Sequence, residues 1–371
     1  MFRLVAALTF CAAFSSHALD LSPVTRDLNG YFSQQLKKDK VPGGALVVVQ
    51  GDKVQLLSLY GVRKQGERSK VDENTVFRLA SVSKTFASEL AAIMVKEHKL
   101  NWDDPISNYL PEFRYKNLEA SNQLQVQHLL SHTTGMVHNV YDNLLDAHQP
   151  LSKIYPMFER LEPLCMPGNC YGYTNLMFGL IDPILKQSAN KNYSELMQQK
   201  VFDPLEMTDA SLGMQSYLHS DNRAAPHVRG KTRWYARKVE LDYYRVLPAA
   251  GVNASISDMG QWLKAQLGGY PAVISPDVLE TVSTPRIETK RDMRRKYWRK
   301  KLKRADYGLG WRIFNYGGEE LIYHSGWVTG FSAELAYSKK HNIGIGLLIN
   351  GESSVGSRIV THFWDEVLKQ L

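Results

Sequence analysis

Cysteine is scarce in this chain, with three among 371 residues, and the motifs of several enzyme classes are missing. No H-x-H-x-D or H-E-x-x-H pattern is present to indicate a zinc hydrolase. The nucleophile elbow G-x-S-x-G does not occur, since GESSVG at residues 351–356 misses its spacing by one. The absence of G-x-G-x-x-G and of a P-loop counts against a dinucleotide- or nucleotide-binding enzyme. We therefore expect neither a metal nor a cofactor.

Long hydrophobic runs are also absent, and the short run at the N-terminus has the features of an export signal. Arg3 precedes an apolar run over residues 4–14, and Ser16-His17-Ala18 offers small residues before a cut after Ala18. The run is too short to span a bilayer, and no later run approaches 18 residues. A buried N-terminal helix is the alternative. We expect residues 1–18 to be a signal peptide and residues 19–371 to be a periplasmic or secreted protein, not an integral membrane protein.

Export changes the interpretation of the cysteines, because Cys11 lies inside the expected signal peptide. Cys165 and Cys170 remain, in the sequence CMPGNC. In an oxidising compartment such a pair is a candidate disulfide, and closing so short a loop contributes roughly 2 kcal/mol through chain entropy. Two free, buried thiols are the alternative.

Positive charge is concentrated in one stretch. The chain has a formal net charge of +8, and residues 290–304, KRDMRRKYWRKKLKR, contain ten basic residues and one acidic residue. The remaining sequence is therefore close to neutral. An exported protein rarely meets nucleic acid, so we expect either a solvated, mobile segment or a contact with an anionic envelope polymer or membrane surface.

The pattern of hydrophobic residues predicts an α/β (α+β) fold. Residues 22–40 have the spacing of an amphipathic helix, and two predicted strands follow. Four more strands are predicted toward the C-terminus, before a closing helix over about 355–370. We expect one antiparallel sheet built from both chain termini and flanked by helices, plus a large, mostly helical insertion. The approximate bounds are 22–80 and 305–371 for the sheet part and 81–304 for the helical part.

Ser81 and Lys84 lie three residues apart in FRLASVSKTF, directly before an apolar run. Phe86, Leu90 and Met94 follow with the spacing of a buried helix face, which places Ser81 in the first turn of a helix. Unpaired backbone N–H groups and the helix dipole favour negative charge there, and a partly buried Lys84 could accept the serine proton. A helix-capping serine beside a solvated lysine is the alternative.

Two further stretches carry polar groups suited to a cleft. Tyr173 and Asn175 lie two residues apart before an apolar helix, so an extended turn would point both side chains the same way. A tyrosine near a cationic lysine can serve as a base. His324, Ser325 and Gly326 end one predicted strand, where the glycine permits close approach of a substrate. A packed aromatic with a capping asparagine, and a plain hairpin turn, are the alternatives.

Taken together and in this order, SVSK at 81–84, YTN at 173–175 and HSG at 324–326 resemble the motifs of the serine β-lactamase and penicillin-binding-protein superfamily. The resemblance is greatest to the class C β-lactamases and the related soluble DD-peptidases, D-aminopeptidases and esterases, and it covers roughly residues 25–370. The supporting stretches are LLSHTTGM at 129–136, PLEMTDASLG at 204–213, AAGVNASISDMGQWL at 249–263 and YGLGW at 307–311. The family fold, a sheet from both termini beside a helical domain, agrees with the fold predicted above.

The resemblance implies a hydrolytic mechanism with a role for each position. Ser81 would be acylated by the substrate carbonyl, while Lys84 and Tyr173 would share the proton transfers. The backbone N–H groups of Ser81 and Trp327 would form the oxyanion hole, and water would then release the acyl group. Asn175 would hold the amide side chain of the substrate. The remaining residues expected to bind substrate are His324, Ser325, Gly326 and Trp327.

One departure from the family bears on the substrate. Most β-lactamases carry a lysine where this chain has His324, and a histidine is only partly charged at pH 7. We therefore expect carboxylate-bearing substrates to be handled better below about pH 6.5. The sequence leaves open whether the substrate is a β-lactam, a D-amino-acid peptide or a simple ester. A wall-associated protein that is acylated by penicillin with little turnover is a further alternative.

Overall fold

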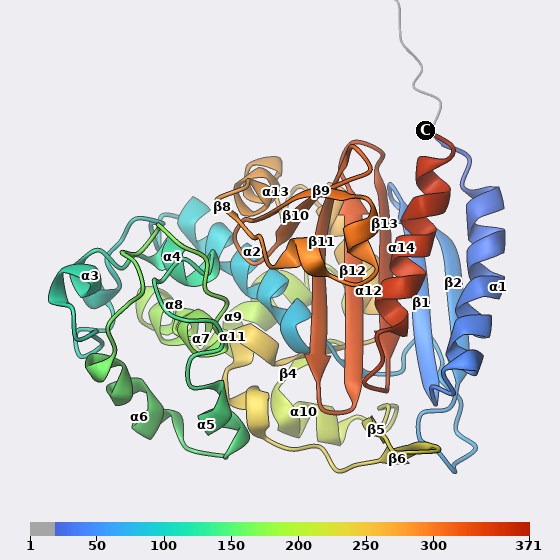
Figure 1. Cartoon of the computed structure of the whole chain (residues 1–371), viewed down its shortest axis with the longest axis horizontal. Helices are drawn as coiled ribbons and strands as arrows, with labels where there is room; N and C mark the ends of the chain where they lie inside the picture. The colour runs from blue at the N-terminus through green and yellow to red at the C-terminus, as the bar shows by residue number, and fades with distance from the viewer. Residues whose placement is uncertain (1–18) are drawn as a thin grey trace, which may run out of the picture.

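A computed structural model describes residues 19–371, so the expected signal peptide, residues 1–18, lies outside the described residues. The chain forms an eight-stranded antiparallel sheet with helices on both faces and a large group of helices beside it (Figure 1). Between residues 19 and 371, no helix is both long enough and apolar enough to cross a membrane.

Both ends of the chain contribute to the sheet, as the sequence predicted. The strand order is β2-β1-β13-β12-β11-β10-β9-β8, so the N-terminal hairpin pairs with the last strand. This β1–β13 pairing is antiparallel and joins Gly44 to Ile349. The strands are β1 (Gly43–Gln50), β2 (Lys53–Gly61), β8 (Ile287–Glu288), β9 (Leu302–Tyr307), β10 (Arg312–Tyr316), β11 (Glu319–Val328), β12 (Phe331–Ser338) and β13 (Ile343–Ile349).

The two terminal helices, α1 (Ser22–Lys38) and α14 (Val355–Leu368), cover one face of the sheet and contact each other (Figure 1). In α1 the buried Leu28, Phe32 and Leu36 lie four residues apart, so the amphipathic pattern decides which side of the helix faces the core. On the opposite face, α12 (Ile256–Gln266) packs against β1 and β13. The sheet is therefore the middle of three layers.

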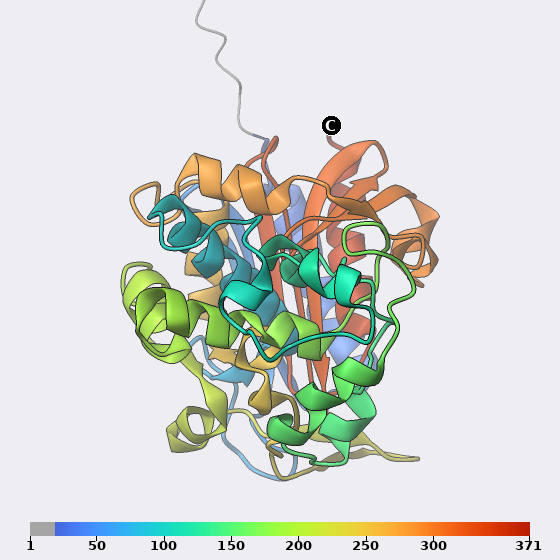
Figure 2. The ribbon, with the colours of Figure 1, turned by 90° about the vertical axis from the view of Figure 1, so that its left-hand side faces the viewer.

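The remaining elements form the mostly helical part, which faces the viewer in Figure 2. Its central helix, α2 (Ser83–Lys96), packs against α8, α9, α11 and α13. The other helices are α3 (Leu118–Asn122), α4 (Val126–Leu130), α5 (Asp142–Asp146), α6 (Leu151–Ile154), α7 (Asn175–Gly179), α8 (Ile181–Ala189), α9 (Tyr193–Met197), α10 (Gly213–His219), α11 (Leu247–Ala250) and α13 (Pro276–Ser283). The small strands are β3 (Phe77–Arg78), β4 (Ser211–Leu212), β5 (His227–Arg229), β6 (Trp234–Ala236) and β7 (Val252–Ala254), and the 3₁₀ turns used below are η1 (Ala80–Val82) and η6 (Asp292–Arg294).

The basic segment, residues 290–304, is packed onto the sheet. Trp298 is buried against aromatic residues of β10 and β11, and Leu302 begins β9. Some of its charges are neutralised by the ion pairs Arg295–Asp292, Lys301–Asp365 and Arg304–Asp306. The interpretation as a wholly solvated segment is therefore wrong, because its apolar residues anchor it. Its contact with an anionic envelope polymer stays a prediction.

Candidate active site

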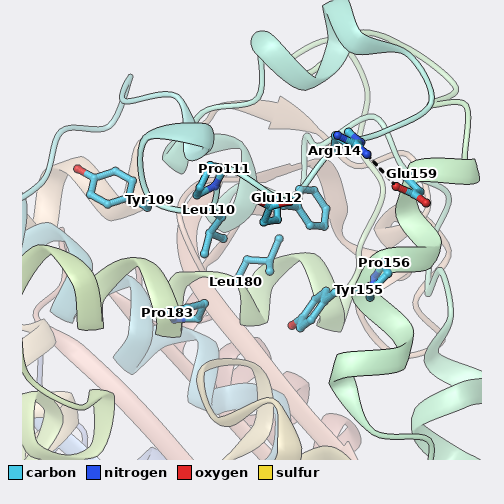
Figure 3. A pocket seen from close by; sticks show the side chains of 11 residues that line it. Tyr109, Leu110, Pro111, Glu112, Arg114, Tyr155, Pro156, Glu159, Leu180 and Pro183 are labelled. Atoms are coloured by element: carbon cyan, nitrogen blue, oxygen red, sulfur yellow. Dashed lines mark hydrogen bonds and ion pairs between the residues drawn. The ribbon is translucent and has the colours of Figure 1, made fainter.

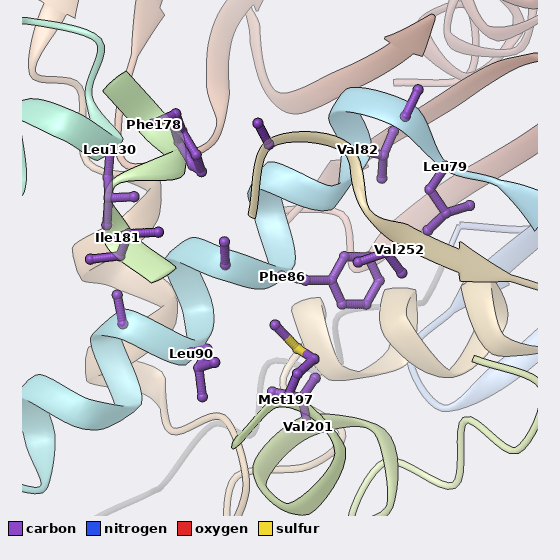
Figure 4. Close-up of a cluster of buried hydrophobic side chains, with 14 of the residues drawn as sticks. Leu79, Val82, Phe86, Leu90, Leu130, Phe178, Ile181, Met197, Val201 and Val252 are labelled. Atoms are coloured by element: carbon purple, nitrogen blue, oxygen red, sulfur yellow. The ribbon is translucent and has the colours of Figure 1, made fainter. Parts of the chain in front are cut away.

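Ser81 lies at a strained turn between a strand and the buried helix α2. The chain passes from β3 into η1, and α2 begins two residues after the serine. Ala80, directly before it, has a φ of +50°, a left-handed conformation that is unfavourable for alanine. Apolar packing holds this turn, since Val82 and Phe86 are fully buried in the cluster of Figure 4. The hydrophobic core thus fixes the position of the serine.

Lys84 lies one helical turn after Ser81 and is fully buried. Its side-chain nitrogen donates to the Ser81 hydroxyl oxygen at 3.3 Å, to the side-chain oxygen of Asn175 at 2.7 Å and to the backbone oxygen of Ala249 at 2.9 Å. Burial lowers the pKa of Lys84, because the charged form loses its hydration. A lysine that is held in this way and is easier to deprotonate can take the proton from Ser81.

The ring of Tyr173 lies beside Lys84, with the ammonium nitrogen 4.7 Å from the ring centroid. Burial on its own would raise the pKa of this phenol. The positive charges of Lys84 and Arg312, with hydrogen bonds to Lys84 and Ser81, outweigh burial and lower the pKa of Tyr173. A phenol with a lowered pKa beside the serine can accept and return a proton.

The loop before Tyr173 is fixed by a disulfide bond and a buried histidine. Cys165 and Cys170 form the disulfide expected from the sequence. The backbone N–H of Thr174 donates to Nδ1 of His132, whose ring centroid lies 4.1 Å from that of Tyr173. The disulfide bond and His132 therefore both restrain the loop that leads to the Tyr173 phenol.

Asn175 links Lys84 to a buried carboxylate that the sequence analysis missed. The amide nitrogen of Asn175 donates to Asp142 at 2.7 Å, while its oxygen accepts from Lys84. Burial raises the pKa of Asp142 to about 6. Asp142 lies 33 residues before Asn175, and no motif around it marks the pairing, which exists only in the folded chain.

The end of β11 forms a second side of the site. The pairing of β10 with β11 ends at Tyr323, so the following residues of β11 have no β10 partner. A Cβ built on Gly326 would lie 2.0 Å from the oxygen of Leu79 and 3.0 Å from the backbone nitrogen of Ser81, so only glycine fits. This close approach sets the end of β11, at Gly326, against the backbone N–H of Ser81.

His324 belongs to the same strand, β11, but does not line the cavity. It is fully buried, its Nε2 accepts a hydrogen bond from the Tyr307 hydroxyl at 3.1 Å, and its Nδ1 donates to the backbone oxygen of Ser325 at 2.9 Å. Burial, assisted by the positive charges of Arg312 and Lys84, lowers the pKa of His324 well below 6.5. The expectation that His324 gains a charge just below pH 6.5 is therefore wrong.

A permanent positive charge lies beside Tyr173 on Arg312 instead. This buried guanidinium is 5.4 Å from the ring centroid of Tyr173 and 5.5 Å from that of Tyr307, and its Nε donates to Asp292 at 3.1 Å. The sequence analysis missed Arg312 and Asp292. The one available signal was that Arg312 directly follows YGLGW, a stretch that already resembled the family.

These groups surround one cavity of about 540 Å³. Four predicted residues do not line the cavity: Lys84 contacts Ser81 from the buried side, His324 is buried within β11, and the Cys165–Cys170 disulfide braces the loop that leads to Tyr173. A serine hydroxyl in contact with a buried lysine, and next to a phenol, can attack a carbonyl carbon. The predicted site residues that line the cavity are Ser81, Tyr173, Asn175, Ser325, Gly326 and Trp327.

A separate hollow of about 500 Å³ lies on the helical part and shares no lining residue with the cavity at Ser81 (Figure 3). Aromatic and proline side chains such as Tyr109, Tyr155 and Pro183 form most of its wall, and the ion pair Arg114–Glu159 lies at its edge. No serine, cysteine, lysine or histidine lines this hollow, so it offers no such nucleophile.

Comparison with known proteins places these features in a family. The family described as Beta-lactamase matches residues 28–367 of this chain. Protein flp of Staphylococcus aureus is 22% identical over 351 residues, which cover 92% of this chain and 66% of that protein. Unguisins hydrolase ungD' of Aspergillus campestris is 24% identical over 366 residues, which cover 93% of this chain and 66% of that protein. The chain thus spans slightly less than two thirds of the length of these relatives.

Two solved structures share the fold. The octameric penicillin-binding protein homologue from Pyrococcus abyssi aligns with a TM-score of 0.81 at 21% identity, covering 93% of this chain and 77% of the other. EstCE1, a hydrolase with promiscuous acyltransferase activity, aligns with a TM-score of 0.77 at 18% identity, covering 93% of this chain and 98% of the other.

Proposed function

This chain belongs to the β-lactamase family, and we propose that it is an exported serine hydrolase that cleaves an amide or ester bond through an acyl-enzyme on Ser81. The observation that carries the proposal is the contact between the Ser81 hydroxyl and the buried Lys84 amine at the wall of the cavity. The hydrolase names of two similar proteins support the reaction class.

The proposed reaction uses the residues in a fixed order. Lys84, helped by Tyr173, takes the proton of Ser81 while the serine oxygen attacks the substrate carbonyl carbon. The backbone N–H groups of Ser81 and Trp327 stabilise the oxyanion, and removing one such donor typically slows an enzyme by about 10²–10³-fold. Tyr173 returns the proton to the leaving nitrogen or oxygen. Water then attacks the acyl-enzyme, releasing the acid and restoring the serine.

Two substrate classes follow from different features. The family relationship favours an amide, either a β-lactam or a D-amino-acid peptide of the cell wall. The side chain of Trp327, 52% exposed on the cavity wall, offers an apolar surface that suits a simple ester. A carboxylesterase is therefore the second candidate, and a penicillin-binding protein with little turnover is the third.

Export is part of the proposal. The N-terminal pattern ending at Ala18 predicts a cleaved signal peptide, and the Cys165–Cys170 disulfide suits an oxidising compartment such as the periplasm or the exterior of the cell.

The test is the intact mass of residues 19–371 after brief exposure to a penicillin, with a simple nitrophenyl ester assayed in parallel. We expect a mass increase or turnover in the wild type and neither in Ser81→Ala. Ser188→Ala is the matched control, since Ser188-x-x-Lys191 repeats the spacing of Ser81 and Lys84 outside the cavity.

The outcomes separate the candidates. A persistent penicillin adduct indicates a penicillin-binding protein or DD-peptidase, whereas an adduct that clears while the drug is opened indicates a β-lactamase. Turnover of the ester without an adduct favours the esterase. Acylation of Ser81→Ala would refute the nucleophile, and no reaction of the wild type with either compound would count against the proposed function.

A further inference from the structure

A second basic surface lies where β5 and β6 form a short antiparallel hairpin, at the lower edge of Figure 1. Residues 223–238, which contain the hairpin, have six basic side chains and no acidic one, and residues 62–70 have four basic side chains and one acidic one. We call these two stretches the hairpin surface. It shares no residue with the basic segment, and the overall composition conceals it because acidic residues elsewhere balance its charge.

Buried contacts hold the hairpin surface together. The backbone N–H of Gln65 donates to Nε2 of the buried His227 at 2.9 Å, which joins the two stretches. The indole N–H of Trp234, which is also buried, donates to the backbone oxygen of Asp39 at 3.1 Å and anchors the hairpin to the end of α1. The fold therefore gathers the basic side chains of both stretches in one place.

A cavity of about 640 Å³ lies between the two stretches. Two acidic side chains, Glu67 and Asp221, line it together with five basic ones, which are Arg63, Lys64, Arg223, Arg237 and Lys238. Lys64 forms an ion pair with Glu67 at 2.6 Å. Arg63 donates to the backbone oxygen of Asp221 at 2.8 Å, and Arg223 donates to another backbone oxygen, so neither charge is neutralised by these bonds. The wall therefore has an excess of positive charge.

Arg237 and Lys238 are available to a ligand on this wall. Both are exposed, and neither side chain makes an ion pair or hydrogen bond with any residue from 19 to 371. The charge continues along the hairpin, because Arg229, Lys231 and Arg233 are also exposed and have no ion-pair partner within the described part of the chain. Positive charge thus extends from the cavity to the tip of the hairpin.

The spacing of these charges favours a chain over a single small anion. Arg233 and Arg237 stand at either end of β6, four residues apart, and extended backbone places such residues about 13 Å from each other. One small anion cannot contact both, whereas a linear polymer with repeated charges can. The mixed guanidinium and ammonium donors of the cavity suit phosphate groups, whose oxygen atoms can be reached from several directions.

The hairpin surface is poorly suited to a membrane. Its tip, residues 230–233, has the sequence GKTR and no apolar side chain that could enter a bilayer. Leu218 and Tyr235 are exposed apolar side chains of this region. However, Leu218 lies in the cavity wall, and the ring of Tyr235 lies 4.9 Å from the guanidinium of Arg233. Neither side chain is at the tip.

We propose that the hairpin surface binds a linear anionic polymer that carries phosphate groups along its chain. Arg237 and Lys238 contact phosphate groups at the cavity, and Arg229, Lys231 and Arg233 contact the groups that follow. This contact holds the protein on the polymer and is independent of the chemistry at Ser81. Export, as proposed above, makes an envelope polymer the partner.

The test measures the binding of inorganic polyphosphate to residues 19–371 by calorimetry at several salt concentrations. We expect Arg237→Ala/Lys238→Ala to raise Kd about tenfold at low salt. The slope of log Kd against log salt concentration should fall by about 1.4, because each phosphate contact on a single strand contributes about 0.7. Lys153→Ala/Arg160→Ala is the matched control, since it removes an exposed lysine and an exposed arginine from the helical part, and it should bind as the wild type. Equal midpoints of urea unfolding show that the variants are folded.

An unchanged Kd in Arg237→Ala/Lys238→Ala, or an equal rise in Lys153→Ala/Arg160→Ala, would overturn the proposal. Inorganic phosphate at the same total phosphate concentration should not displace the polymer, and full displacement would show a site for a single anion instead. Polyglutamate should bind more weakly than polyphosphate, and equal binding would refute the preference for phosphate.

Two further probes test the class of partner. Binding to phosphatidylglycerol vesicles without binding to polyphosphate would assign the surface to a membrane and overturn the polymer. Tighter binding of duplex DNA than of polyphosphate would assign it to a nucleic acid and overturn the envelope partner. None of these measurements needs turnover, so Ser81→Ala should bind polyphosphate as the wild type does, and a failure of the proposed function leaves the result on the hairpin surface intact.

Discussion

The side-chain nitrogen of Lys84 and the amide oxygen of Asn175 are 2.7 Å apart, which ties the proposed proton acceptor on α2 to the first residue of α7. A lysine side chain is long and flexible, so its nitrogen stays beside Ser81 only where such contacts hold it. The other end of the Asn175 amide is fixed by Asp142. Asn175 is therefore a positioning residue for Lys84 as well as an expected contact of the substrate.

Replacing Asn175 should slow the chemical step. We predict that Asn175→Ala lowers kcat by about 10²-fold, because the lysine loses a charged hydrogen bond and its alignment with the serine, and general-base catalysis contributes about 10²–10⁴-fold. Ester hydrolysis under saturating substrate measures this effect. Asn122→Ala, on the exposed end of α3, is the control and should behave as the wild type. A fall in kcat of less than threefold in Asn175→Ala would contradict the positioning role.

We expect the activity to fall as the pH drops, because Asp142 becomes protonated. Its folded pKa of about 6 means that the carboxylate is ionised above pH 6 and protonated below it. The ionised carboxylate accepts the hydrogen bond of Asn175 at Oδ2, whereas a protonated Asp142 can turn donor and release the amide from its orientation toward Lys84. We predict that kcat/KM for a neutral ester falls as pH drops through about 6, and that Asp142→Asn removes this limb of the profile.

His324 provides the contrast for this pH experiment. Because burial keeps the pKa of His324 well below 6.5, His324→Gln should leave the position of the acid limb unchanged, even if the activity is lower. A limb that persists in Asp142→Asn and disappears in His324→Gln would reverse the assignment of the titrating group.

The sequence was sufficient for those parts of the site that depend on local pattern. Ser81 lies in the 3₁₀ turn η1 and Lys84 in the first turn of α2, which follows it directly, so their spacing along the chain fixes their distance once the following residues form a buried helix face. The sheet from both termini was also predictable, because six of its eight strands are each marked by an apolar run and turn residues. The strands β8, before the basic segment, and β9, which begins within it, were not predicted.

The parts that escaped prediction depend on residues distant in sequence. Asp292 and Arg312 are 20 residues apart and meet only because η6 packs against β9, the strand next to β10 in the sheet. The motif at residues 324–326 placed His324 at the site, but it did not show that the side chain is buried. Burial next to Tyr307 keeps the imidazole ring neutral. In the basic segment, charge density suggested a solvated stretch, whereas Trp298 holds it against the sheet.

The Cys165–Cys170 disulfide should contribute to stability and to the placement of Tyr173. The bond closes a short loop, and its removal should cost roughly 2 kcal/mol in the free energy of unfolding. We predict this loss for the double variant Cys165→Ser/Cys170→Ser in urea titrations. We also predict a lower kcat, because the loop leads to Tyr173 and helps to position its phenol. Mild reduction of the wild type should reproduce the loss. Two free thiols in denatured, unreduced protein consisting of residues 19–371 would show that the bond does not form.

Glu89 lowers the free energy of unfolding by an amount that depends on pH. It is fully buried on α2, and neither of its side-chain oxygens has a hydrogen-bond partner of good geometry among residues 19–371. Burial raises its pKa from 4.5 to about 8, although Trp311 and Gln266 nearby reduce the rise. The unfolded chain therefore releases this proton from about pH 4.5 upward, while the folded chain retains it up to about pH 8. Stability is lost over this window as the pH rises, and no further loss from Glu89 follows above pH 8.

Glu89→Gln should remove this dependence, since glutamine has nearly the same shape and stays neutral. Between pH 5 and pH 8 we predict that the wild type loses on the order of 3 kcal/mol of unfolding free energy relative to Glu89→Gln, because each pKa unit corresponds to about 1.4 kcal/mol. Urea titrations of both proteins at the two pH values measure the difference. Glu73→Gln, at an exposed position, should follow the wild type. Parallel pH dependence of the wild type and Glu89→Gln would mean that Glu89 is ionised in the folded chain, with a counter-charge or water reaching it next to α2.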